Sequence, residues 1–560
     1  MISQTLNAYS RRLEDFLTPA IAEKAGVVEL RRGPSPLVIT GLEYDSRKVK
    51  PGNLYFALPG LHADGHDFIP EALERSAAAV VHQNELGEYR NGVLYIKVKD
   101  SRFAMSPLAD AFYDFPSRRL AIIGVTGTEG KSTTVYLIFQ LLKFLGKKTG
   151  FISTVYQGDG ISENFTVEHQ TTPEAVTIQR LLAQMCQNGA GYAVLESSSH
   201  GLSKRTNRLG DVAFDAAVMT TVTHEHLEFH GSWEQYRSDK AELFRSLDSS
   251  SHRKQGQAGE ISVPAFGVAN ADDPSAVYFA AATKQKTFTF STKGAQADLS
   301  LRSMESTSAG NLYEAIVGSS GEILTIRDEL PGAFNAGNVF AALLAVSNLL
   351  SMEIRDLVSL VPRLKPVRGR MNPVRCGQPF EVIVDYAHTP SSFETIFPPL
   401  RERLNASGGR LISLFGSAGE RDTGKRPKQG EIAAIYSDIV FLSDEDPRGE
   451  EPMSILEDIA KGCEAASGCE ATQGCEAASG CETTQGCEAR RMIRNETLFL
   501  IPGRPQAIRK AFSLARKGDL VLLLGKGHEN SIIYAKGTIP YDETAEAEKA
   551  LEEMGYCEKL

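Results

Sequence analysis

Long apolar stretches are missing from this 560-residue sequence, and so is an excess of positive charge. No apolar run approaches the roughly 20 residues of a membrane-spanning helix, so we expect no membrane partner. Lysine and arginine number 60 against 70 acidic residues, a net charge of −10. Because nucleic-acid-binding proteins normally carry a basic surface, we expect no nucleic-acid partner either. The first residues lack a basic segment followed by an apolar core, which predicts a cytoplasmic protein.

Cysteine is scarce outside one repeated segment. Five of the eight cysteines recur every sixth residue within residues 462–489, where variants of Gly-Cys-Glu-Ala-Ala-Ser and Gly-Cys-Glu-Ala-Thr-Gln follow one another. The other three, Cys186, Cys376 and Cys557, do not suggest a disulfide framework. The low hydrophobicity of the repeat predicts a flexible surface insertion, which lengthens the loop or helix that begins at Met453.

The chain is too long for one compact core, so we expect several domains. Alternating strand and helix patterns predict an α/β fold with a mostly parallel central sheet covered by helices on both faces. We place the domain limits at residues 1–116, 117–365 and 366–560.

One segment of the central unit carries the strongest chemical signal. The apolar run Leu120–Val125 predicts a buried strand, a turn with glycines follows, and Val135–Leu142 predicts a helix. Such a turn directs backbone N–H groups and the positive end of the helix dipole at one point, which suits a phosphate. Lys131 supplies a charge for the terminal phosphates of ATP, and Ser132 supplies a hydroxyl for Mg²⁺. Valine at 125 departs from the usual pattern, which has glycine there, and the alternative is an ordinary strand–turn–helix corner.

The segment Thr126–Ser132, Thr-Gly-Thr-Glu-Gly-Lys-Ser, resembles the phosphate loop of the Mur ligase family. Its members join amino acids to a nucleotide-linked sugar in bacterial peptidoglycan synthesis. Further segments resemble signatures of the tripeptide-forming branch of this family, in the family's order: Asp45–Ile69, Leu195–His200, Thr223–Gly231, Asp239–Phe244, Arg368–Met371, Val382–Pro390, Asp444–Arg448 and Gly525–Glu529. The resemblance implies three domains: a UDP-sugar-binding domain, a central ATP-binding domain of the phosphate-loop type, and a Rossmann-like C-terminal domain.

The resemblance also implies an ATP site. Lys131 and Arg370 are expected to contact the γ-phosphate and Asp385 the ribose, while Asn335 and Asn338 are expected near the adenine. From local sequence alone, an asparagine there is equally a cap of a core helix. The expected ATP-binding residues are Thr126, Gly127, Thr128, Glu129, Gly130, Lys131, Ser132, Asn335, Asn338, Arg370 and Asp385.

Magnesium is the metal that the resemblance implies. Ser132, Glu196 and His226 are its expected ligands, and Lys240 is expected to be carbamylated (N6-carboxylysine). Carbamylation makes electrostatic sense, because an unmodified lysine facing Mg²⁺ would be repelled. His226 and His230 also have the i, i+4 spacing of zinc ligands on a helix, but no third ligand pattern accompanies them. The expected catalytic residues are Lys131, Lys240, His226 and Arg370.

The nucleotide-sugar substrate is expected to be UDP-N-acetylmuramoyl-L-alanyl-D-glutamate. By motif, its expected contacts are Tyr44, Ser46, Leu61, His62, Ala63, Gln170, Thr171, Thr172, Ser198, Lys204 and Arg208. Gln170 replaces the asparagine that is usual in the family. Arg208 is the preferred contact for the substrate carboxylate, and Arg205 is the alternative.

A free diamino acid is the second expected substrate. Arg421 and Arg448 suit its carboxylate, and Glu529 suits its distant ammonium. The expected set is Arg421, Glu445, Asp446, Pro447, Arg448, Gly525 and Glu529. Asp446 replaces the asparagine typical of meso-diaminopimelate enzymes. An anion there would repel the second carboxylate of diaminopimelate, which favours L-lysine or L-ornithine.

The implied activity is ATP-dependent amide formation through an acyl phosphate, in a monomeric enzyme. A folylpolyglutamate synthetase of the same superfamily is one alternative, which would lack the uridine-type first domain. A nucleotide-gated regulatory protein without ligase activity is the other. The departures from the family pattern at Gln170, in the Arg208 region and at residues 445–446 keep it open, whereas the presence of Lys131, Glu196, His226 and Lys240 argues against it.

Overall fold

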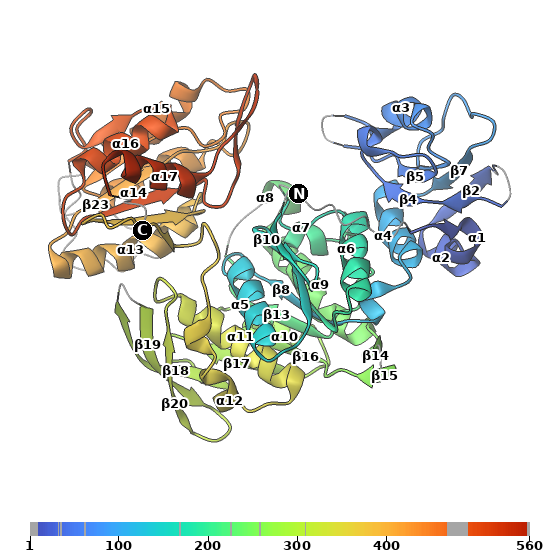
Figure 1. Ribbon diagram of the computed structural model, residues 1–560, viewed down its shortest axis with the longest axis horizontal. Coiled ribbons are helices and arrows are strands. Elements are labelled where there is room, and N and C mark those ends of the chain that lie inside the picture. The colour runs from blue at the N-terminus through green and yellow to red at the C-terminus, as the bar shows by residue number, and fades with distance from the viewer. Residues whose placement is uncertain are drawn as a thin grey trace. The chain divides into compact units, whose positions relative to one another are not determined.

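A computed structural model of the chain describes residues 9–31, 33, 36–60, 63–166, 170–223, 227–256, 259–307, 310–467 and 491–556. The chain divides into two compact units. The first takes in residues 1–305, 312–328 and 334–364, and the second takes in residues 306–311, 329–333 and 365–560. Helices pack on sheets in both units, which confirms the predicted α/β class (Figure 1).

A five-stranded sheet comes first along the chain. Its order is β2 (Val27–Arg31), β7 (Leu94–Val98), β6 (Ala79–His82), β5 (Asn53–Phe56), β4 (Gly41–Glu43). Only β2 pairs antiparallel with its neighbour. Leu54 and Phe56 of β5 pack with Leu108 of α4 (Ser101–Phe112) in one apolar core. The smaller elements are β1 (Arg11–Arg12), β3 (Val38–Ile39), α1 (Leu13–Phe16), α2 (Pro19–Lys24) and α3 (Ile69–Glu74).

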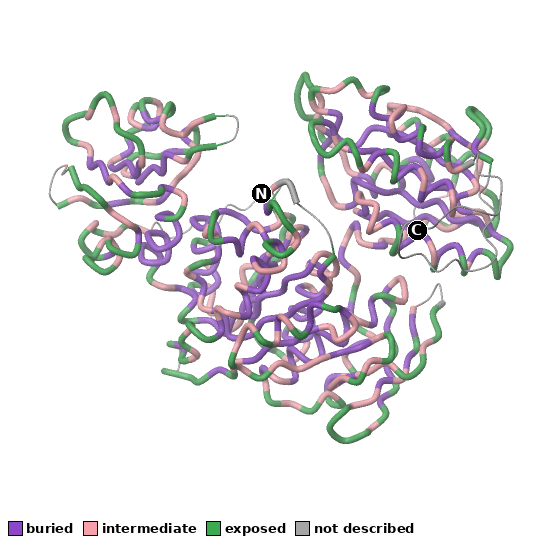
Figure 2. The backbone as a smooth tube through the Cα atoms, turned by 180° about the vertical axis from the view of Figure 1, so that it is seen from behind, coloured by how far each residue is buried: buried purple, intermediate pink, exposed green. Residues whose placement is uncertain are grey.

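The central sheet of the first unit has eleven strands. Their order is β11 (Glu163–Phe165), β10 (Tyr156–Gly158), β9 (Thr149–Ile152), β12 (Tyr192–Glu196), β8 (Ala121–Thr126), β13 (Ala216–Met219), β16 (Phe266–Asn270), β17 (Thr287–Ser291), β18 (Leu299–Thr307), β19 (Gly310–Val317), β20 (Ile323–Asp328). The strands from β9 to β18 are parallel, and the strands in the middle of this run are buried (Figure 2). Short apolar runs without alternation are typical of strands covered on both faces, and this explains why the sequence predicts them correctly.

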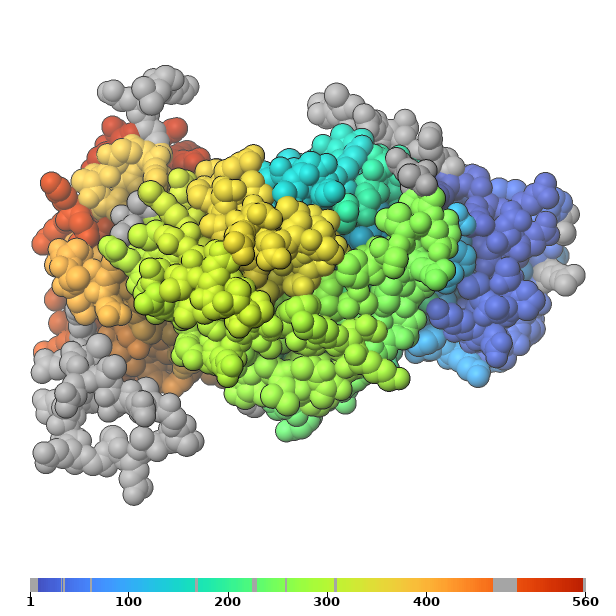
Figure 3. Space-filling model, turned by 90° about the horizontal axis from the view of Figure 1, so that it is seen from below, coloured from blue at the N-terminus to red at the C-terminus, as the bar shows by residue number. Residues whose placement is uncertain are grey.

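Helices cover both faces of this sheet. The helices α5 (Lys131–Phe144) and α11 (Asn335–Leu350) pack on each other and on the sheet, whereas α6 (Ala175–Gln187) and α9 (Trp233–Ser249) share a second core with other strand side chains. The other elements are α7 (Ser199–Leu202), α8 (Leu227–His230), β14 (Arg253–Gly256), β15 (Gly259–Ser262), α10 (Ala276–Ala280) and α12 (Ile354–Val358). In Figure 3, β18 to β20 belong to the yellow-green part of the surface and α12 belongs to the yellow part.

The second unit contains a six-stranded sheet. Its order is β21 (Asn372–Pro373), β22 (Glu381–Asp385), β26 (Leu520–Leu524), β23 (Leu411–Phe415), β24 (Ile439–Leu442), β25 (Leu498–Leu500). All pairs except β21–β22 are parallel. Helices α13 (Pro390–Ser407), α14 (Lys425–Tyr436) and α15 (Pro452–Ser467) pack in one apolar core, and α16 (Arg504–Leu514) and α17 (Glu543–Glu553) in another. The hairpin β27 (Ser531–Tyr534) and β28 (Gly537–Pro540) completes the unit. The domain limits predicted from the sequence lie outside the three large sheets, and we keep them as a proposal.

The first six residues of the repeat depart from the prediction of a flexible surface segment. Helix α15 continues through them to Ser467, and Cys463 is fully buried in the core that Ile455 and Ile459 also line. These residues are spaced four apart, so they share one helix face. The rest of the repeat lies outside the described residues.

The described residues also show the state of three cysteines and the character of the helices. Of the described cysteines, Cys186 and Cys463 are buried, and Cys376 is disulfide-bonded, which the sequence did not predict. No helix in the described part of the chain combines the length and apolar character that crossing a membrane requires.

Candidate active site

The phosphate loop lies between β8, the strand at the middle of the central sheet, and α5. Gly127 and Gly130 have φ angles of 148° and 80°, which favour glycine, and Gly130 is the N-cap of α5. Val125 lies inside β8 and is fully buried. The chain is therefore still extended where the usual pattern has its first glycine, so valine fits that position.

Residues after β13 hold this loop in place. The Thr128 N–H and the Glu129 N–H donate to the Thr221 carbonyl and hydroxyl, and the Thr220 hydroxyl donates to the Glu129 carbonyl. A Cβ at Gly127 would overlap the Thr220 hydroxyl. The Lys131 Nζ lies over the loop and donates to the Thr128 carbonyl at 2.7 Å. The loop is thus a rigid cradle with a cation at its rim, as an anion site at a helix N-terminus requires.

Ser132 and Glu196 meet beside the loop. The Ser132 hydroxyl lies 3.0 and 2.9 Å from the two carboxylate oxygens of Glu196, which ends β12, the strand next to β8. The Thr154 N–H also donates to Glu196, and both Ser132 and Glu196 are buried. A hydroxyl and a carboxylate next to a phosphate cradle are hard oxygen donors of the kind that Mg²⁺ prefers, so these residues fit the expected metal.

Lys240 reaches the loop from α9. Its Nζ donates to the Gly127 carbonyl at 2.5 Å and lies 4.5 Å from the centre of the Tyr236 ring, and the residue is 2% exposed. The structure thus brings Lys240 to the loop that holds Lys131. Its carbamylation stays a prediction, and His226 lies outside the described residues.

His230 does not serve a zinc ion. Its Nδ1 lies 2.7 Å from Asp239 and its Nε2 lies 3.0 Å from the Ser199 hydroxyl, and the side chain is fully buried. Both ring nitrogens are therefore engaged in a structural bridge between α8, α9 and α7. Within the described residues, no group of three or more His, Cys, Asp or Glu side chains is arranged to hold a metal.

Asn335 and Asn338 lie at the start of α11, directly behind the phosphate loop. Neither is the N-cap, which is Phe334, so the capping alternative is wrong. The Asn338 amide donates to the Asn335 oxygen, and its own oxygen accepts from the Thr134 hydroxyl and lies where a Cβ at Gly130 would be. These contacts place Asn338 under the loop; the expected adenine contacts of both residues stay predictions.

The expected dipeptide-binding residues surround the end of β12. The Thr172 hydroxyl donates to the Glu196 carbonyl and accepts from the Ser198 N–H, and the Ser198 hydroxyl caps α7. Arg208 donates to the Thr172 carbonyl at 2.9 Å. By contrast, Arg205 donates to the Phe229 carbonyl at the end of α8. Arg208 is thus the arginine next to Thr172, and its contact with the substrate carboxylate stays a prediction.

Two residues in this region were missed by the sequence analysis. One carboxylate oxygen of Glu174 accepts from Arg208 at 2.9 Å and from Arg102 at 3.0 Å, and Arg102 also donates to the Pro59 carbonyl. Arg102 belongs to α4 of the first sheet, so Glu174 joins the two expected substrate-binding regions. In the sequence, the only sign of this contact is an acidic residue, Glu174, two positions after Thr172. Its partners Arg102 and Arg208 are distant in sequence, so a local pattern does not reveal them.

The other expected substrate residues of the first unit differ in exposure. Gln170 and Ala63 are exposed, and Lys204 forms an ion pair with Glu242 at 3.4 Å. Ser46 is buried and donates to Glu71, and Tyr44 packs against the first core. Thr171 is half-buried, and Leu61 and His62 lie outside the described residues.

Asp385 and Arg370 belong to the second unit. The Asp385 oxygens accept from the Met371 and Ala387 N–H groups at 2.6 and 2.7 Å, which fastens the turn that carries Arg370. Burial raises the pKa of Asp385, and the Arg370 guanidinium opposes that rise. Arg370 stacks on the Tyr386 ring, 4.7 Å from its centre. Their contacts with ATP stay predictions.

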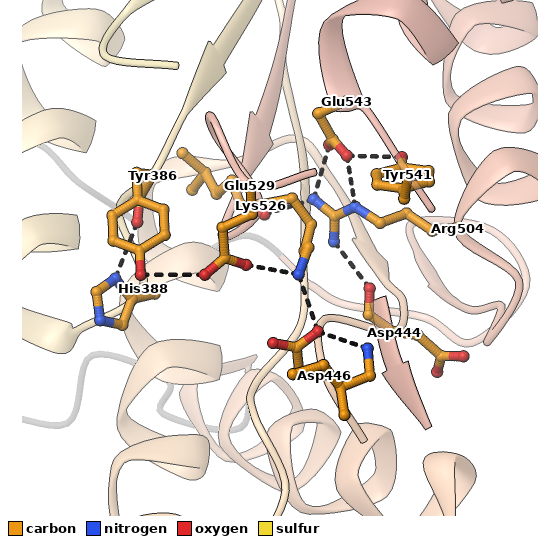
Figure 4. Close-up of polar contacts among 11 residues, drawn as sticks. Tyr386, His388, Asp444, Asp446, Arg504, Lys526, Glu529, Tyr541 and Glu543 are labelled. Carbon is orange, nitrogen blue, oxygen red and sulfur yellow. Dashed lines mark hydrogen bonds and ion pairs between the residues drawn. The ribbon is translucent and has the colours of Figure 1, made fainter. Parts of the chain in front are cut away.

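The expected amino-acid residues follow β24 and β26 of the second unit, except Arg421, which follows β23. Lys526 is fully buried, and its Nζ donates to Asp446 at 2.9 Å and to Glu529 at 2.5 Å (Figure 4). The Tyr386 hydroxyl donates to the other Glu529 oxygen, and the Ile533 N–H donates to Asp446. From the sequence, the negative charge of Asp446 favours L-lysine or L-ornithine. Lys526 pairs with Asp446 and Glu529 together, so one negative charge remains in this cluster, and the preference stays a prediction.

The remaining members of this set differ in exposure. Glu445 is buried beside Gly525, where a Cβ would lie 2.9 Å from its Oε2. Arg448 has a left-handed backbone (φ 55°) and donates its N–H to the Ile533 carbonyl, Pro447 is buried, and Arg421 is exposed.

Arg504 fastens both loops of this set from behind. It is fully buried, pairs with Glu543 at 2.7 Å, and donates to the carbonyls of Asp444 and Leu524, which lie directly before Glu445 and Gly525 (Figure 4). Burial raises the pKa of Asp444 to about 6. The structure therefore brings together Glu445, Asp446, Gly525 and Glu529 from segments about 80 residues apart.

A rigid phosphate cradle at the carboxyl ends of parallel strands, with an oxygen pair for Mg²⁺ beside it, defines a phosphate-loop nucleotide-binding enzyme. Three family profiles match this chain: the Mur ligase family catalytic domain at residues 38–113, the Mur ligase middle domain at 125–346, and the Mur ligase glutamate ligase domain at 369–527. The chain belongs to the Mur ligase family.

Individual relatives agree with this assignment over nearly the whole chain. A UDP-N-acetylmuramyl-tripeptide synthetase from Treponema denticola is 47% identical, over 95% of this chain and 98% of the relative. A UDP-N-acetylmuramoyl-L-alanyl-D-glutamate–2,6-diaminopimelate ligase from Geobacillus thermodenitrificans is 35% identical, over 94% and 97%. A solved structure of a ligase with the latter name aligns over 98% of this chain and 99% of its own, with a TM-score of 0.58 and 25% identity.

Proposed function

We propose that this chain joins a diamino acid to UDP-N-acetylmuramoyl-L-alanyl-D-glutamate in an ATP-dependent reaction of peptidoglycan synthesis. The observation that carries the proposal is similarity over nearly the whole chain to relatives named for this reaction. A phosphate loop with Lys131 at its rim and with Ser132 hydrogen-bonded to Glu196 of β12 supports it. We also propose that the enzyme acts as a monomer.

The first chemical step activates the substrate. The γ-carboxylate of the D-glutamyl group attacks the γ-phosphate of ATP, which forms an acyl phosphate and releases ADP. Loop N–H groups and Lys131 stabilise the charge on the transferring phosphoryl group. Ser132 and Glu196 would hold a Mg²⁺ ion, which supplies further positive charge to the phosphates when bound. Arg208 would orient the substrate from the end of β12.

The second step forms the amide. The amine of the incoming amino acid attacks the acyl carbonyl, a carbon–nitrogen bond forms, and inorganic phosphate leaves. Arg421 and Arg448 would bind the carboxylate of the amino acid, and the acidic residues around Lys526 would face its distal end. Asp446 and Glu529 share the single positive charge of Lys526, so the cluster keeps one negative charge, which favours a distal ammonium as in L-lysine or L-ornithine.

Phosphate release from ATP tests the proposal. The protein is incubated with UDP-N-acetylmuramoyl-L-alanyl-D-glutamate and either L-lysine, L-ornithine or meso-diaminopimelate, and we expect release that depends on one of them. Lys131→Ala should abolish release, whereas Lys147→Ala, at an exposed lysine beyond the end of α5, should retain it. No release with any amino acid would favour a regulatory protein without ligase activity.

A further inference from the structure

A fully buried lysine lies between two carboxylates of the amino-acid set, and neither step of the proposed reaction uses it. Lys526 donates to Asp446 Oδ1 and to Glu529 Oε2, and its side chain is completely inaccessible to solvent. Asp446 also accepts from the Ile533 N–H, and Glu529 from the Tyr386 hydroxyl (Figure 4). These contacts fix all three charges in one arrangement.

The three charges add to −1. Without the lysine, Asp446 and Glu529 would present a charge of −2 in the same space. Without the Asp446 carboxylate, the remaining pair would be neutral. At the low effective dielectric of a buried site, one unit of charge within a few ångströms of a ligand changes its affinity about tenfold or more.

The carboxylate of Glu445 lies next to this cluster and is available to bind a ligand. Glu445 is 7% exposed, and its buried Oε2 has no hydrogen-bond partner among the described residues. It lies beside Gly525, one residue before Lys526. Lys526 reaches Asp446 and Glu529, whereas none of the described hydrogen bonds or ion pairs joins it to Glu445. The site therefore retains one carboxylate oxygen without a hydrogen-bond partner among the described residues, next to two carboxylates that share one lysine.

We propose that Lys526 determines which diamino acid the enzyme accepts, by setting the charge that the distal end of the amino acid meets. The inference rests on the proposed function. A distal ammonium alone, as in ornithine or lysine, gains from each negative charge. A distal group that carries an ammonium and a carboxylate, as in diaminopimelate, gains from each charge less strongly, because its carboxylate is repelled. Lys526 acts through Asp446 and Glu529, so it is a positioning residue.

The charge of the cluster formed by Asp446, Lys526 and Glu529 predicts how the variants rank in specificity. The three side chains sum to −1 in the unsubstituted protein, 0 in Asp446→Asn, −2 in Lys526→Met, and −1 again in the double variant. We therefore expect the ratio of kcat/KM for meso-diaminopimelate to that for L-ornithine to rise on the order of tenfold in Asp446→Asn and to fall on the order of tenfold in Lys526→Met. In the double variant it should return to the value of the unsubstituted protein.

The experiment measures that ratio by amino-acid-dependent phosphate release, with the thermal midpoint of each variant recorded beside it. Lys526→Arg keeps the charge, so its ratio should stay unchanged even where its rate falls. Lys536→Met, at an exposed lysine of the β27–β28 hairpin, is the matched control. These two variants separate the loss of charge from the loss of a lysine or of stability.

Each outcome has a defined meaning. The predicted order of ratios supports the proposal. Equal loss of kcat/KM for both amino acids in Lys526→Met, with the ratio unmoved, overturns it and leaves Lys526 a structural role. A double variant that matches Asp446→Asn also overturns it, because Asp446 would then act on the ligand directly. If Lys526→Met does not fold, a ratio that moves in Lys526→Arg overturns it. No amino-acid-stimulated release by the unsubstituted protein removes the proposed function and this inference together.

Discussion

A buried carboxyl group in the first unit should make the protein less stable as the pH rises toward neutrality. Asp110 of α4 is 4% exposed, and its Oδ1 has no hydrogen-bond partner within the described residues. Burial raises its pKa to about 7, and the neighbouring charge of Asp211 adds to the rise. In an unfolded chain the pKa of an aspartate is about 3.9. The unfolded state therefore loses this proton first, from about pH 4, while the folded state retains it until about pH 7.

The size of the effect follows from the difference in pKa. Three units correspond to about 4 kcal/mol of unfolding free energy, which is lost progressively between about pH 4 and pH 7. Asp110→Asn cannot ionise, so this loss should be absent. We expect the variant to exceed the unsubstituted protein in stability by about 1.5 kcal/mol at pH 5 and by about 4 kcal/mol at pH 8.

Urea unfolding at several pH values measures this difference. The chain has one tryptophan, Trp233 of α9, so its fluorescence reports on the first unit. Hydrogen exchange of the α4 amides gives the local free energy as a second readout. Asp67→Asn, at an exposed aspartate of the same sheet region, should change stability by less than about 0.5 kcal/mol at every pH. A difference between Asp110→Asn and the unsubstituted protein that is the same at pH 5 and pH 8 would refute the reasoning.

Three further substitutions test the site and its support. Glu196→Gln retains the shape beside Ser132 but removes the charge, so the Mg²⁺ concentration for half-maximal phosphate release should rise about tenfold or more; an unchanged requirement would contradict the proposed oxygen site. Lys240→Ala should lower the rate of phosphate release about 100-fold, with partial recovery on adding a short carboxylic acid if the lysine is carbamylated; full activity would rule out a role for Lys240. Glu543→Gln leaves the buried Arg504 uncompensated and should destabilise the second unit by about 3 kcal/mol, measured by hydrogen exchange in β26, whereas the exposed Glu548→Gln should not.

Local sequence predicted those parts of the fold that depend on a short stretch of chain. Buried strands such as β8 are continuous apolar runs, and helices such as α5 follow a glycine turn, so their positions follow from pattern alone. The cradle of the phosphate loop was predicted for the same reason. The sequence did not explain why valine is accepted at position 125; the structure does, because Val125 lies inside β8.

Local sequence patterns could not predict contacts between segments that are far apart in the chain. Lys526 pairs with Asp446 from 80 residues away, and Glu174 is held by Arg102 of α4 and by Arg208. The sequence presents each of these as an isolated charge, for which exposure to solvent is the ordinary expectation. The burial of Cys463 was missed for a different reason, because the composition of the repeat concealed its place on the apolar face of α15.

The extended backbone at Val125 has a consequence for how this loop can vary among related sequences. Steric contacts exclude larger residues at Gly127 and Gly130. A methyl group would collide with the Thr220 hydroxyl at Gly127 and with the Asn338 oxygen at Gly130. At 125 the constraint is instead that of any central strand, namely a β-favouring residue that fills the core. A search pattern that demands glycine at that position would overlook functional loops of this kind. One that demands the two later glycines, the lysine and the serine would retain them.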